Sequence, residues 1–492
     1  MNPRPFVKPC CGKMFFLPAL LAGLGLLLAG RVHAQTFTTL HSFTALSVPY
    51  SGTNSDGAAP NAGLILSGNA LYGTTDAGGS LGQGAVFKIN TDGTGFTNLH
   101  TFFGYPSDGT APDADLVLSG NTLFGTTSSG GDPGRGTVFK VNTDGSGFTN
   151  LHNFDYSDGF NPFAGLVLSD NTLYGTAAFG GSSGSGTVFR LNTDGSGFTN
   201  LHSFTSYNGF YSTNSDGFNP FAGLVLSDNT LYGAALSGGI SGNGTIFRVN
   251  TDGSCFTNLH NFTSYGGHPY TNSDGANPYG RLVLSSNTLY GTTFWGGSSG
   301  AGVAFGINTD GTGFTNLHSF SGLNDYPTNS DGFNPFAGLI LSDDTLYGTA
   351  PAGGSSGNGT LFAIDRDGTG FTTLHNFAPP YISSVGTNIG GARPVGGLIL
   401  SGKSFYGTAF SGGSSGSGTV FSISFAPQLT IVPSGADVVL SWPSKVAGFD
   451  YAGFILQSAP ASTGTFTNIP GATSPYTNAI TGSQKYFRLV SN

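Results

Sequence analysis

Glutamate is absent from this 492-residue sequence, and charged residues of any kind make up only 8% of it. All 25 acidic residues are therefore aspartates. Because glutamate favours helices while aspartate and glycine favour turns, this composition disfavours a helical protein. The 82 glycines could instead indicate disorder, but disordered chains are poor in aromatic residues and this one has 13%. The composition predicts a turn-rich, all-β protein with a large core.

Basic residues and cysteine are scarce as well. Sixteen Lys and Arg residues stand against 25 acidic residues, which gives a net charge of −9. No basic stripe follows residue 34, so we expect neither nucleic acid nor an anionic membrane as a partner. Of three cysteines, Cys10 and Cys11 precede the first apolar run and only Cys255 lies beyond it. A single thiol cannot form an internal disulfide, so packing must stabilise the fold.

Long hydrophobic runs are missing, with one exception near the start. Residues 15–29 are apolar, a basic segment precedes them, and the small-residue sequence Val-His-Ala ends at Ala34. This pattern predicts a signal peptide over residues 1–34, cleaved after Ala34. The run is short for a transmembrane helix, and no later run is apolar enough to span a bilayer. We therefore expect a secreted or cell-surface protein with no transmembrane segment.

The main signal is an internal repeat of seven similar units, each of about 56 residues. Each unit contains a Leu-Tyr-Gly triplet, a Gly-x-Val-Phe segment and a Phe-Thr-Asn-Leu-His segment, or close variants of them. The triplets begin at Leu71, Leu123, Leu173, Leu231, Leu289, Leu346 and Phe405. The histidines are His41, His100, His152, His202, His260, His318 and His375.

Four short strands are expected within each unit, joined in part by Asn-Thr-Asp-Gly turns. In the first unit they are residues 63–67, 71–75, 85–90 and 96–102. Four strands per unit are typical of a β-propeller blade. The chain begins with a lone fourth strand at 37–43 and its last unit lacks one, so the N-terminal strand can complete the last blade. The sequence predicts a seven-bladed β-propeller over residues 35–426, with an open β-solenoid as the alternative.

The repeat stops after residue 426. Residues 427–492 contain short apolar segments at 429–432, 438–442, 454–457 and 486–490. They predict a small immunoglobulin- or fibronectin-like β-sandwich with Trp442 in its core. This domain could serve for attachment or as a spacer.

The repeated motifs resemble the GloVer (Gloeo/Verruco) tandem-repeat family. Leu-Tyr-Gly-Thr-Thr at 71–75, Gly-Gly at 78–79 and Gly-Ala-Val-Phe-Lys-Ile at 84–89 match its pattern, which recurs from residue 37 to residue 424. The resemblance implies an exported bacterial repeat protein and brings no established activity with it. The paired glycines are also similar to kelch repeats, but the Tyr and Trp of a kelch signature are missing.

Spacing separates a constant part of each unit from a variable part. Leu71 and His100 lie 29 residues apart, as do the same two residues in all six complete units. The interval from the histidine to the next triplet varies from 21 to 30 residues, so insertions fall between the fourth strand and the next first strand. In a propeller this connection shares a face with the second-to-third connection. Such a variable face is typical of a binding scaffold, although unconstrained loops would drift in the same way.

These connections are rich in aromatic and small polar residues, which suits sugar binding or simple packing of the loops against one another. In a symmetric scaffold, function is expected where one unit departs from its siblings. The candidate ligand-binding residues chosen on these two grounds are Trp295, Tyr270, Tyr211, Phe179, Asp113, Asp115 and Arg281. Asp113 and Asp115 could form a carboxylate pair for glycoside chemistry, with neutral drift as the alternative.

Two recurrent residues invite a metal or catalytic interpretation that the pattern disfavours. One aspartate per unit, in Ser-Asp-Gly, fits a turn better than a calcium site, which needs six to eight oxygen ligands. A histidine repeated in every unit fits a buried hydrogen-bonding role, because a catalytic site needs one special place. Zinc, phosphate-loop, nucleotide and nucleophile motifs are missing. We expect no cofactor, no metal and no catalytic residue.

The sequence as a whole favours a monomeric, non-enzymatic binding or scaffold module. Its expected partner is an extracellular glycan or a surface protein, bound through the variable face. A polysaccharide-acting lyase or hydrolase on the same scaffold is one alternative, by analogy of fold. A purely structural cell-envelope protein is the other.

Overall fold

The computed structural model describes residues 34–48, 52–207, 212–266, 270–323, 327–378, 387–479 and 485–490. Every regular element among these residues is a β-strand, which confirms the all-β prediction. None of the described residues forms a helix with the length and apolar character that a bilayer crossing requires. The predicted signal peptide lies outside the described residues except for Ala34.

The repeats fold into antiparallel sheets, six with four strands and one with five among the described residues. The first repeat gives β2 (Ile65–Ser67), β3 (Ala70–Thr75), β4 (Ala85–Asn90) and β5 (Thr97–Thr101), hydrogen-bonded in that order. The next sheets are β6 (Val117–Ser119), β7 (Thr122–Thr127), β8 (Thr137–Asn142) and β9 (Thr149–Asn153); β10 (Val167–Ser169), β11 (Thr172–Ala177), β12 (Thr187–Asn192) and β13 (Thr199–Ser203); and β14 (Val225–Ser227), β15 (Thr230–Ala235), β16 (Thr245–Asn250) and β17 (Thr257–Asn261). They are followed by β18 (Ala276–Pro278), β19 (Val283–Ser285), β20 (Thr288–Trp295), β21 (Val303–Asn308) and β22 (Thr315–Ser319), then by β23 (Ile340–Ser342), β24 (Thr345–Ala350), β25 (Thr360–Asp365) and β26 (Thr372–Asn376).

The last sheet combines the two ends of the repeat region. It contains β27 (Ile399–Ser401), β28 (Ser404–Ala409), β29 (Thr419–Ala426) and, at its outer edge, β1 (Ala34–Ser42). The β1–β29 pairing is antiparallel and runs from Ala34 opposite Ala426 to Ser42 opposite Thr419. The N-terminal strand therefore occupies the fourth position of the last sheet.

The glycine of each Leu-Tyr-Gly triplet is required by packing. Gly73 in β3 pairs with Phe87 in β4, and a Cβ on Gly73 would lie only 2.6 Å from the Phe87 ring and 2.8 Å from Leu64. Phe87 is fully buried. The core then runs between neighbouring sheets, as where Val86 and Phe102 of one sheet join a cluster with residues of the next.

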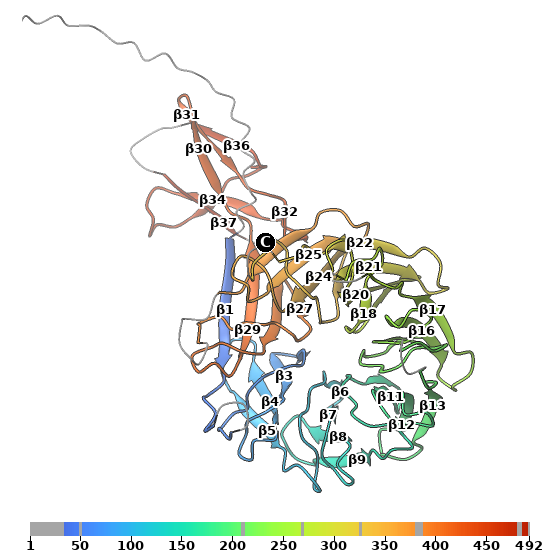
Figure 1. Ribbon diagram of the computed structural model, residues 1–492. Helices are drawn as coiled ribbons and strands as arrows, with labels where there is room; N and C mark the ends of the chain where they lie inside the picture. The colour runs from blue at the N-terminus through green and yellow to red at the C-terminus, as the bar shows by residue number, and fades with distance from the viewer. Residues whose placement is uncertain are drawn as a thin grey trace, which may run out of the picture.

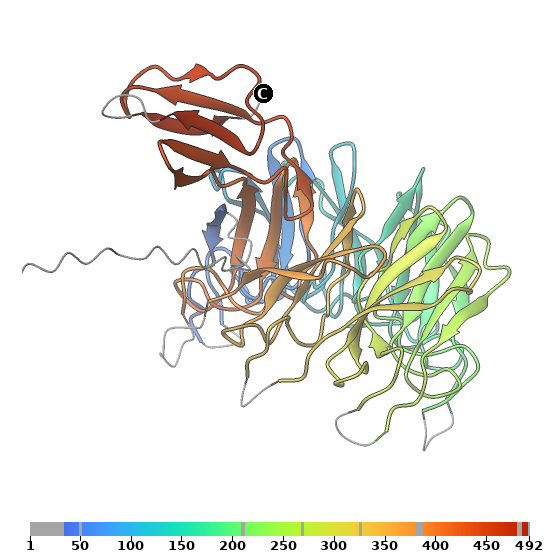
Figure 2. The ribbon, with the colours of Figure 1, turned by 90° about the horizontal axis from the view of Figure 1, so that it is seen from above.

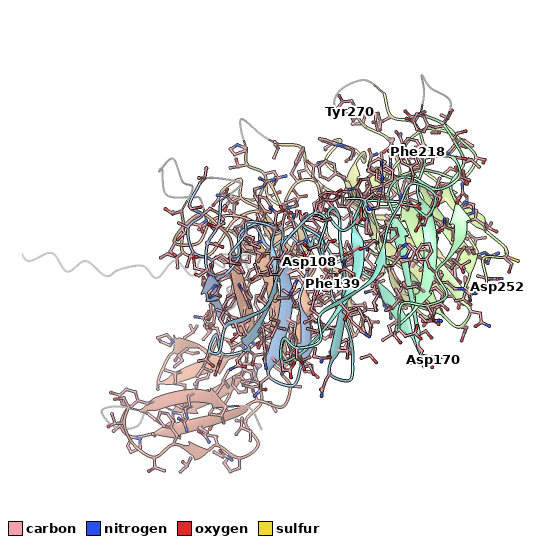
Figure 3. All side chains as sticks on the ribbon, turned by 90° about the horizontal axis from the view of Figure 1, so that it is seen from below. Asp108, Phe139, Asp170, Phe218, Asp252 and Tyr270 are labelled. Carbon is pink, nitrogen blue, oxygen red and sulfur yellow. The ribbon has the colours of Figure 1, made fainter. Side chains whose placement is uncertain are left out.

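The sheets surround a common centre, and the short first strand of each lies on the inside (Figure 1). Seen edge-on, the assembly has two faces (Figure 3). Tyr270 and Phe218 lie in the loops of one face, whereas Asp170 and Asp252 mark tight turns at the opposite face. We call them the loop face and the turn face.

A histidine, an aspartate and a phenylalanine link each sheet to the next. His260 Nε2 lies 2.9 Å from Asp274 Oδ2, and the His260 ring stacks on Phe314 of the following repeat at 4.1 Å. Six such pairs occur, with Nε2–Oδ2 distances of 2.6–2.9 Å: His41–Asp56, His100–Asp108, His152–Asp158, His202–Asp216, His260–Asp274 and His318–Asp331. The predicted hydrogen-bonding role of the histidines is thus confirmed, and the aspartate is its partner.

The turn assigned to this aspartate belongs to a neighbouring residue instead. Asn272 Oδ1 accepts hydrogen bonds from the N–H groups of Gly275 and Gly297 at 2.9 and 3.0 Å, which is the arrangement expected of the turn former. Asp274 points back to His260 and to the Thr263 N–H. In six repeats the histidine and the aspartate each lie at a fixed distance from a Leu-Tyr-Gly triplet, and this is the sequence signal of the pair.

The last repeat breaks this pattern because Gly390 stands where an aspartate would be. There Gln35 Nε2 lies 2.6 Å from His375 Nδ1, and Phe37 stacks on the histidine ring at 4.7 Å. Both partners come from β1. Burial without a carboxylate partner lowers the pKa of His375 to about 4.

The C-terminal part contains two three-stranded sheets and a two-stranded ribbon. They are β30 (Thr430–Ser434), β31 (Asp437–Ser441) and β36 (Tyr476–Ala479); β34 (Ile455–Ala459), β35 (Thr467–Asn468) and β37 (Tyr486–Val490); and β32 (Lys445–Val446) with β33 (Phe449–Asp450). Trp442 packs with Leu440 and Leu456 in a core of its own, as predicted. The C-terminal part lies beside the last repeat sheets on the turn face (Figure 2), where Phe449 and Tyr451 join their core.

Candidate functional site

A cavity at the centre of the sheets opens on the loop face. One side chain from each repeat projects into its mouth, always from the residue that follows a proline. These residues, the mouth ring, are Asn61, Asp113, Phe163, Phe221, Tyr279, Phe336 and Val395. The residue before the proline has a left-handed φ of 53–58° in all seven repeats, which turns the chain inward at this point. The mouth ring lines two overlapping parts of this cavity: one of about 570 Å³ that continues inward, and one of about 520 Å³ that extends to the loop residues, sizes typical of ligand pockets.

One half of the mouth ring is a continuous aromatic arc. Phe163 stacks on Phe221 at 5.0 Å, Phe221 on Tyr279 at 5.2 Å, and Tyr279 on Phe336 at 3.9 Å. Because the inner rings use both faces for each other, the arc presents mainly ring edges to the cavity. Edges carry the positive end of the aromatic quadrupole and therefore suit oxygen atoms.

The other half of the mouth ring carries hydrogen-bonding groups around a carboxyl pair. Asp113 accepts hydrogen bonds from Asn61 Nδ2 at 3.2 Å and Ser128 Oγ at 2.9 Å. Its carboxyl group also meets that of Asp76, which lies in the loop after β3. Burial, reinforced by the charge of Asp76, raises the pKa of Asp113 to about 7, and burial raises the pKa of Asp76. The Asp113 carboxyl group is therefore protonated up to a pH of about 7, next to the carboxyl group of Asp76.

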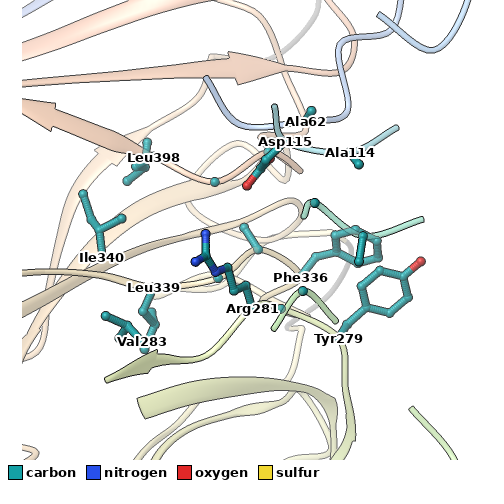
Figure 4. Close-up of a pocket in the computed structure, with 18 of the residues that line it drawn as sticks. Ala62, Ala114, Asp115, Tyr279, Arg281, Val283, Phe336, Leu339, Ile340 and Leu398 are labelled. Carbon is teal, nitrogen blue, oxygen red and sulfur yellow. The ribbon is translucent and has the colours of Figure 1, made fainter. Parts of the chain in front are cut away.

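Below the mouth ring, a second ring has only two side chains. The equivalent residues are Gly63, Asp115, Gly165, Gly223, Arg281, Gly338 and Gly397, which we call the collar. Asp115 Oδ1 accepts a hydrogen bond from the Gly63 N–H at 2.6 Å, and Arg281 Nε donates to the Leu224 carbonyl at 3.0 Å. Figure 4 shows the two charged groups pointing toward each other across the cavity. Among the described residues, no ion pair joins them.

Two aromatic rows extend from the arc toward the rim of the loop face. In the first, Phe221 contacts Phe179, which stacks on Phe160, and the guanidinium of Arg135 lies 4.8 Å from the Phe160 ring. Arg135 also lies 4.7 Å from the ring of Tyr156 at the outer end.

The second row starts at Phe336. It continues through Phe294 and Trp295 to Tyr270, with centroid distances of 6.2, 4.9 and 5.9 Å. Trp295 is half-buried and also packs against Phe333, whereas Tyr270 is 39% exposed. Trp295 therefore takes part in loop packing as well as lining the loop face.

The structure thus places the predicted site residues in two groups. Asp113, Asp115 and Arg281 lie in the central cavity, whereas Phe179, Trp295 and Tyr270 lie in the rows that radiate from it. Tyr211 lies outside the described residues.

Two features of the cavity escaped sequence reasoning. Asp113 is paired with Asp76 of the preceding repeat, and Asp115 instead faces Arg281. The aromatic arc was also missed, because Phe163, Phe221 and Phe336 look like ordinary repeat residues. Aligning the repeats on their prolines would have placed all seven mouth residues in one column. Among the described residues, His, Cys and Asp side chains form no group that could hold a metal ion.

Comparison with known proteins shows similarity of repeat sequence and distant similarity of structure. The chain resembles the extracellular domain of a candidate one component system from B. thetaiotaomicron (12% identity, TM-score 0.46, 84% of this chain and 46% of that one). It also resembles oligogalacturonate lyase from Vibrio parahaemolyticus (10%, TM-score 0.43, 79% and 96%) and a protein of a nidogen/laminin complex (14%, TM-score 0.38, 63% and 93%).

A search of curated proteins finds none that matches. The sequence model described as Gloeobacter/Verrucomicrobia repeat matches residues 29–215 and 265–468, on both sides of the middle repeat. These two segments contain most of the repeat sheets. The match confirms the family resemblance that the Leu-Tyr-Gly series suggested. The chain therefore belongs to the Gloeobacter/Verrucomicrobia repeat family, and its repeat sheets form a β-propeller-like scaffold.

Proposed function

We propose that this protein is an exported, non-enzymatic module that binds carbohydrate at the mouth of its central cavity. The observation that carries the proposal is the division of the mouth ring into an aromatic arc and a hydrogen-bonding half. Sugar hydroxyl groups both accept and donate hydrogen bonds: their oxygen atoms suit the ring edges of the arc, and their hydrogen atoms suit the acceptors of the other half. Export is supported by the signal-peptide pattern of residues 1–34.

The scaffold of this proposal is a closed, seven-bladed β-propeller over residues 35–426. Closure is supported by β1, which pairs with β29. Its Phe37 stacks on His375, just as Phe314 stacks on His260 between two consecutive sheets. Closure is also supported by a threonine that reaches from one sheet to the mouth of the next. Thr74 Oγ1 donates to the Ala114 carbonyl at 3.3 Å, and Thr408 Oγ1 of the last sheet donates to Ala62 of the first at 2.7 Å. Residues 427–492 are the small sandwich domain of this architecture.

The carboxyl pair favours a second candidate function, acid-assisted cleavage of a polysaccharide. Asp113 keeps its proton up to a pH of about 7, as a general acid requires. Against this candidate, the two carboxyl groups of a glycosidase usually lie about 5–10 Å apart on either side of the bond. Asp76 and Asp113 contact each other and leave no room for a sugar between them. Binding is therefore the preferred function.

The test is a panel of neutral polysaccharides scored for both binding and released products. Replacing Tyr279 with Ala interrupts the arc at its centre and should weaken binding of any positive polysaccharide about tenfold or more, with no change in products. The control is Tyr105→Ala, which removes a ring 66% exposed on the same face but outside the mouth ring. Equal effects of the two variants would refute a site at the mouth.

Two further arms locate and classify the activity. A variant with both Trp295 and Tyr270 replaced by Ala tests the outer row. If it binds as tightly as the parent, the site is confined to the mouth. Released sugars that disappear in Asp113→Asn would instead support the cleavage function.

A further inference from the structure

The collar is the most asymmetric part of an otherwise repeated cavity. Five of its seven positions are glycine, and at two of them, Gly165 and Gly338, a neighbouring repeat approaches too closely for a side chain. A Cβ on Gly338 would lie 2.7 Å from the Arg281 carbonyl oxygen, and one on Gly165 would lie 3.0 Å from the Asp115 carbonyl oxygen. The two exceptions, Asp115 and Arg281, therefore define the free space at this level.

The collar follows the mouth ring by two residues in each repeat, in the bent segment that leads into the first strand. Asp115 and Arg281 line the part of the cavity that continues inward and not the part that extends to the loop residues. Below them the wall is formed by β-branched residues such as Ile65, Val283 and Ile340, which offer no hydrogen bonds.

Both charged groups of the collar retain hydrogen-bonding capacity directed into the cavity. Each is fixed by one backbone hydrogen bond from a neighbouring repeat. The remaining carboxylate oxygen of Asp115 and the terminal amino groups of Arg281 have no hydrogen-bond partner among the described residues. An acceptor therefore faces a set of donors across the cavity.

We propose that the collar binds the terminal residue of a glycan chain, whose neighbouring hydroxyl groups bridge Asp115 and Arg281. A hydroxyl group donates to a carboxylate and accepts from a guanidinium, so a pair of them satisfies both side chains at once. A chain that lies flat across the loop face remains at the level of the mouth ring. Only the terminal sugar of a chain can reach the collar while the sugars that precede it still contact the aromatic arc. This inference rests on the carbohydrate-binding function proposed above.

The test uses chain length. The polysaccharide that binds best in the panel is compared with its own fragments from disaccharide to hexasaccharide, by calorimetry, with affinity expressed per mole of chains. If a chain end is bound, affinity per chain levels off once the mouth is filled and the polymer binds no more tightly than the hexasaccharide. If internal residues are bound, affinity per chain keeps rising with length because each chain offers more sites.

Collar variants provide the second readout. Arg281→Met and Asp115→Asn should each weaken binding of the hexasaccharide about tenfold or more, the loss expected when a hydrogen bond to a charged group is removed. The controls are Arg190→Met in β12 and Asp170→Asn on the turn face, which should bind like the parent. Arg281→Lys keeps the charge but not the paired donors, and replaces Arg281→Met if that variant fails to fold.

The outcomes separate this inference from the function on which it rests. If no polysaccharide binds, the carbohydrate-binding function is wrong and the collar inference is refuted with it. If a polysaccharide binds with affinity that grows with length, or if both collar variants bind like the parent, only the chain-end inference is wrong.

Discussion

Removal of the histidine from one inter-sheet link should destabilise the protein by an amount that can be assigned to its contacts. His260→Ala removes the 2.9 Å hydrogen bond to Asp274 and the stacking on Phe314. It leaves the Asp274 side chain, 7% exposed, with only Thr263 as a partner. A hydrogen bond to a charged group contributes about 1.5–3 kcal/mol and the aromatic contact about 0.5–1.5 kcal/mol. Because His260 is 19% exposed, we expect a net loss of about 1–3 kcal/mol.

The assay is a double-mutant cycle in chemical denaturation. His260→Ala, Asp274→Asn and the double variant are unfolded in urea, and the coupling free energy is taken from the four stabilities. We expect the double variant to be about as stable as the less stable single variant, with a coupling of about 1–2 kcal/mol. His375→Ala serves as a comparison, since His375 contacts Gln35 and no carboxylate.

Acidity supplies an independent check on the same pair. Burial opposes ionisation of Asp274, but hydrogen bonds from His260 and Thr263 outweigh it and hold its pKa below 3.8. The folded state therefore favours the ionised carboxyl, so this stabilisation is present above pH 3.8 and is lost as the pH falls through the lower folded pKa. The coupling should shrink in that acidic range. Additive single effects at neutral pH, or a coupling unchanged in acid, would refute the proposed pairing.

Two further predictions concern the seam and the mouth. Deleting residues 35–43 removes the outer strand of the last sheet together with Phe37, so the melting temperature should fall by more than on trimming any loop, and an unchanged melting temperature would contradict closure. Asp113→Asn should raise the melting temperature more at pH 8 than at pH 4. The pKa of Asp113 in the folded protein, about 7, exceeds the ordinary 3.8, so the parent loses stability as the pH rises between these values and the variant does not. Equal shifts in melting temperature at both pH values would disprove the raised pKa.

The sheets could be predicted from the sequence because each element repeats a local signal. The third strand was expected at 85–90 and β4 is Ala85–Asn90, since alternating apolar residues and the following Asn-Thr-Asp-Gly turn fix both ends. The first strand was expected at 63–67, but β2 begins at Ile65. The preceding residues bend around the cavity, and the Gly63 N–H bonds to Asp115 of another sheet instead of to a neighbouring strand.

The site was predicted only in part, because it depends on contacts between repeats. Asp113 and Arg281 were found because they differ from their siblings at one position. The pairing of Asp113 with Asp76 could not be found in this way, since Asp76 lies 37 residues before Asp113 and meets it only when neighbouring sheets pack. The aromatic arc has the same origin: each ring conforms to its own repeat, and the stack exists only around the centre.

The pairing of β1 with β29 has one end that the C-terminal residues protect. Because the strands are antiparallel, Ala34 and Ala426 lie together. A force that pulls these two residues apart would break the hydrogen bonds between β1 and β29 one after another. The C-terminal domain sits at that same point: Tyr451 donates its hydroxyl hydrogen to the Phe425 carbonyl, and its ring packs in the core of the last sheet. Separation of β1 from β29 at this end therefore requires that the contacts of Tyr451 break first. Because the first and last strands of the repeat region meet in this sheet, the contacts of Tyr451 set how strongly β1 and β29 resist being pulled apart.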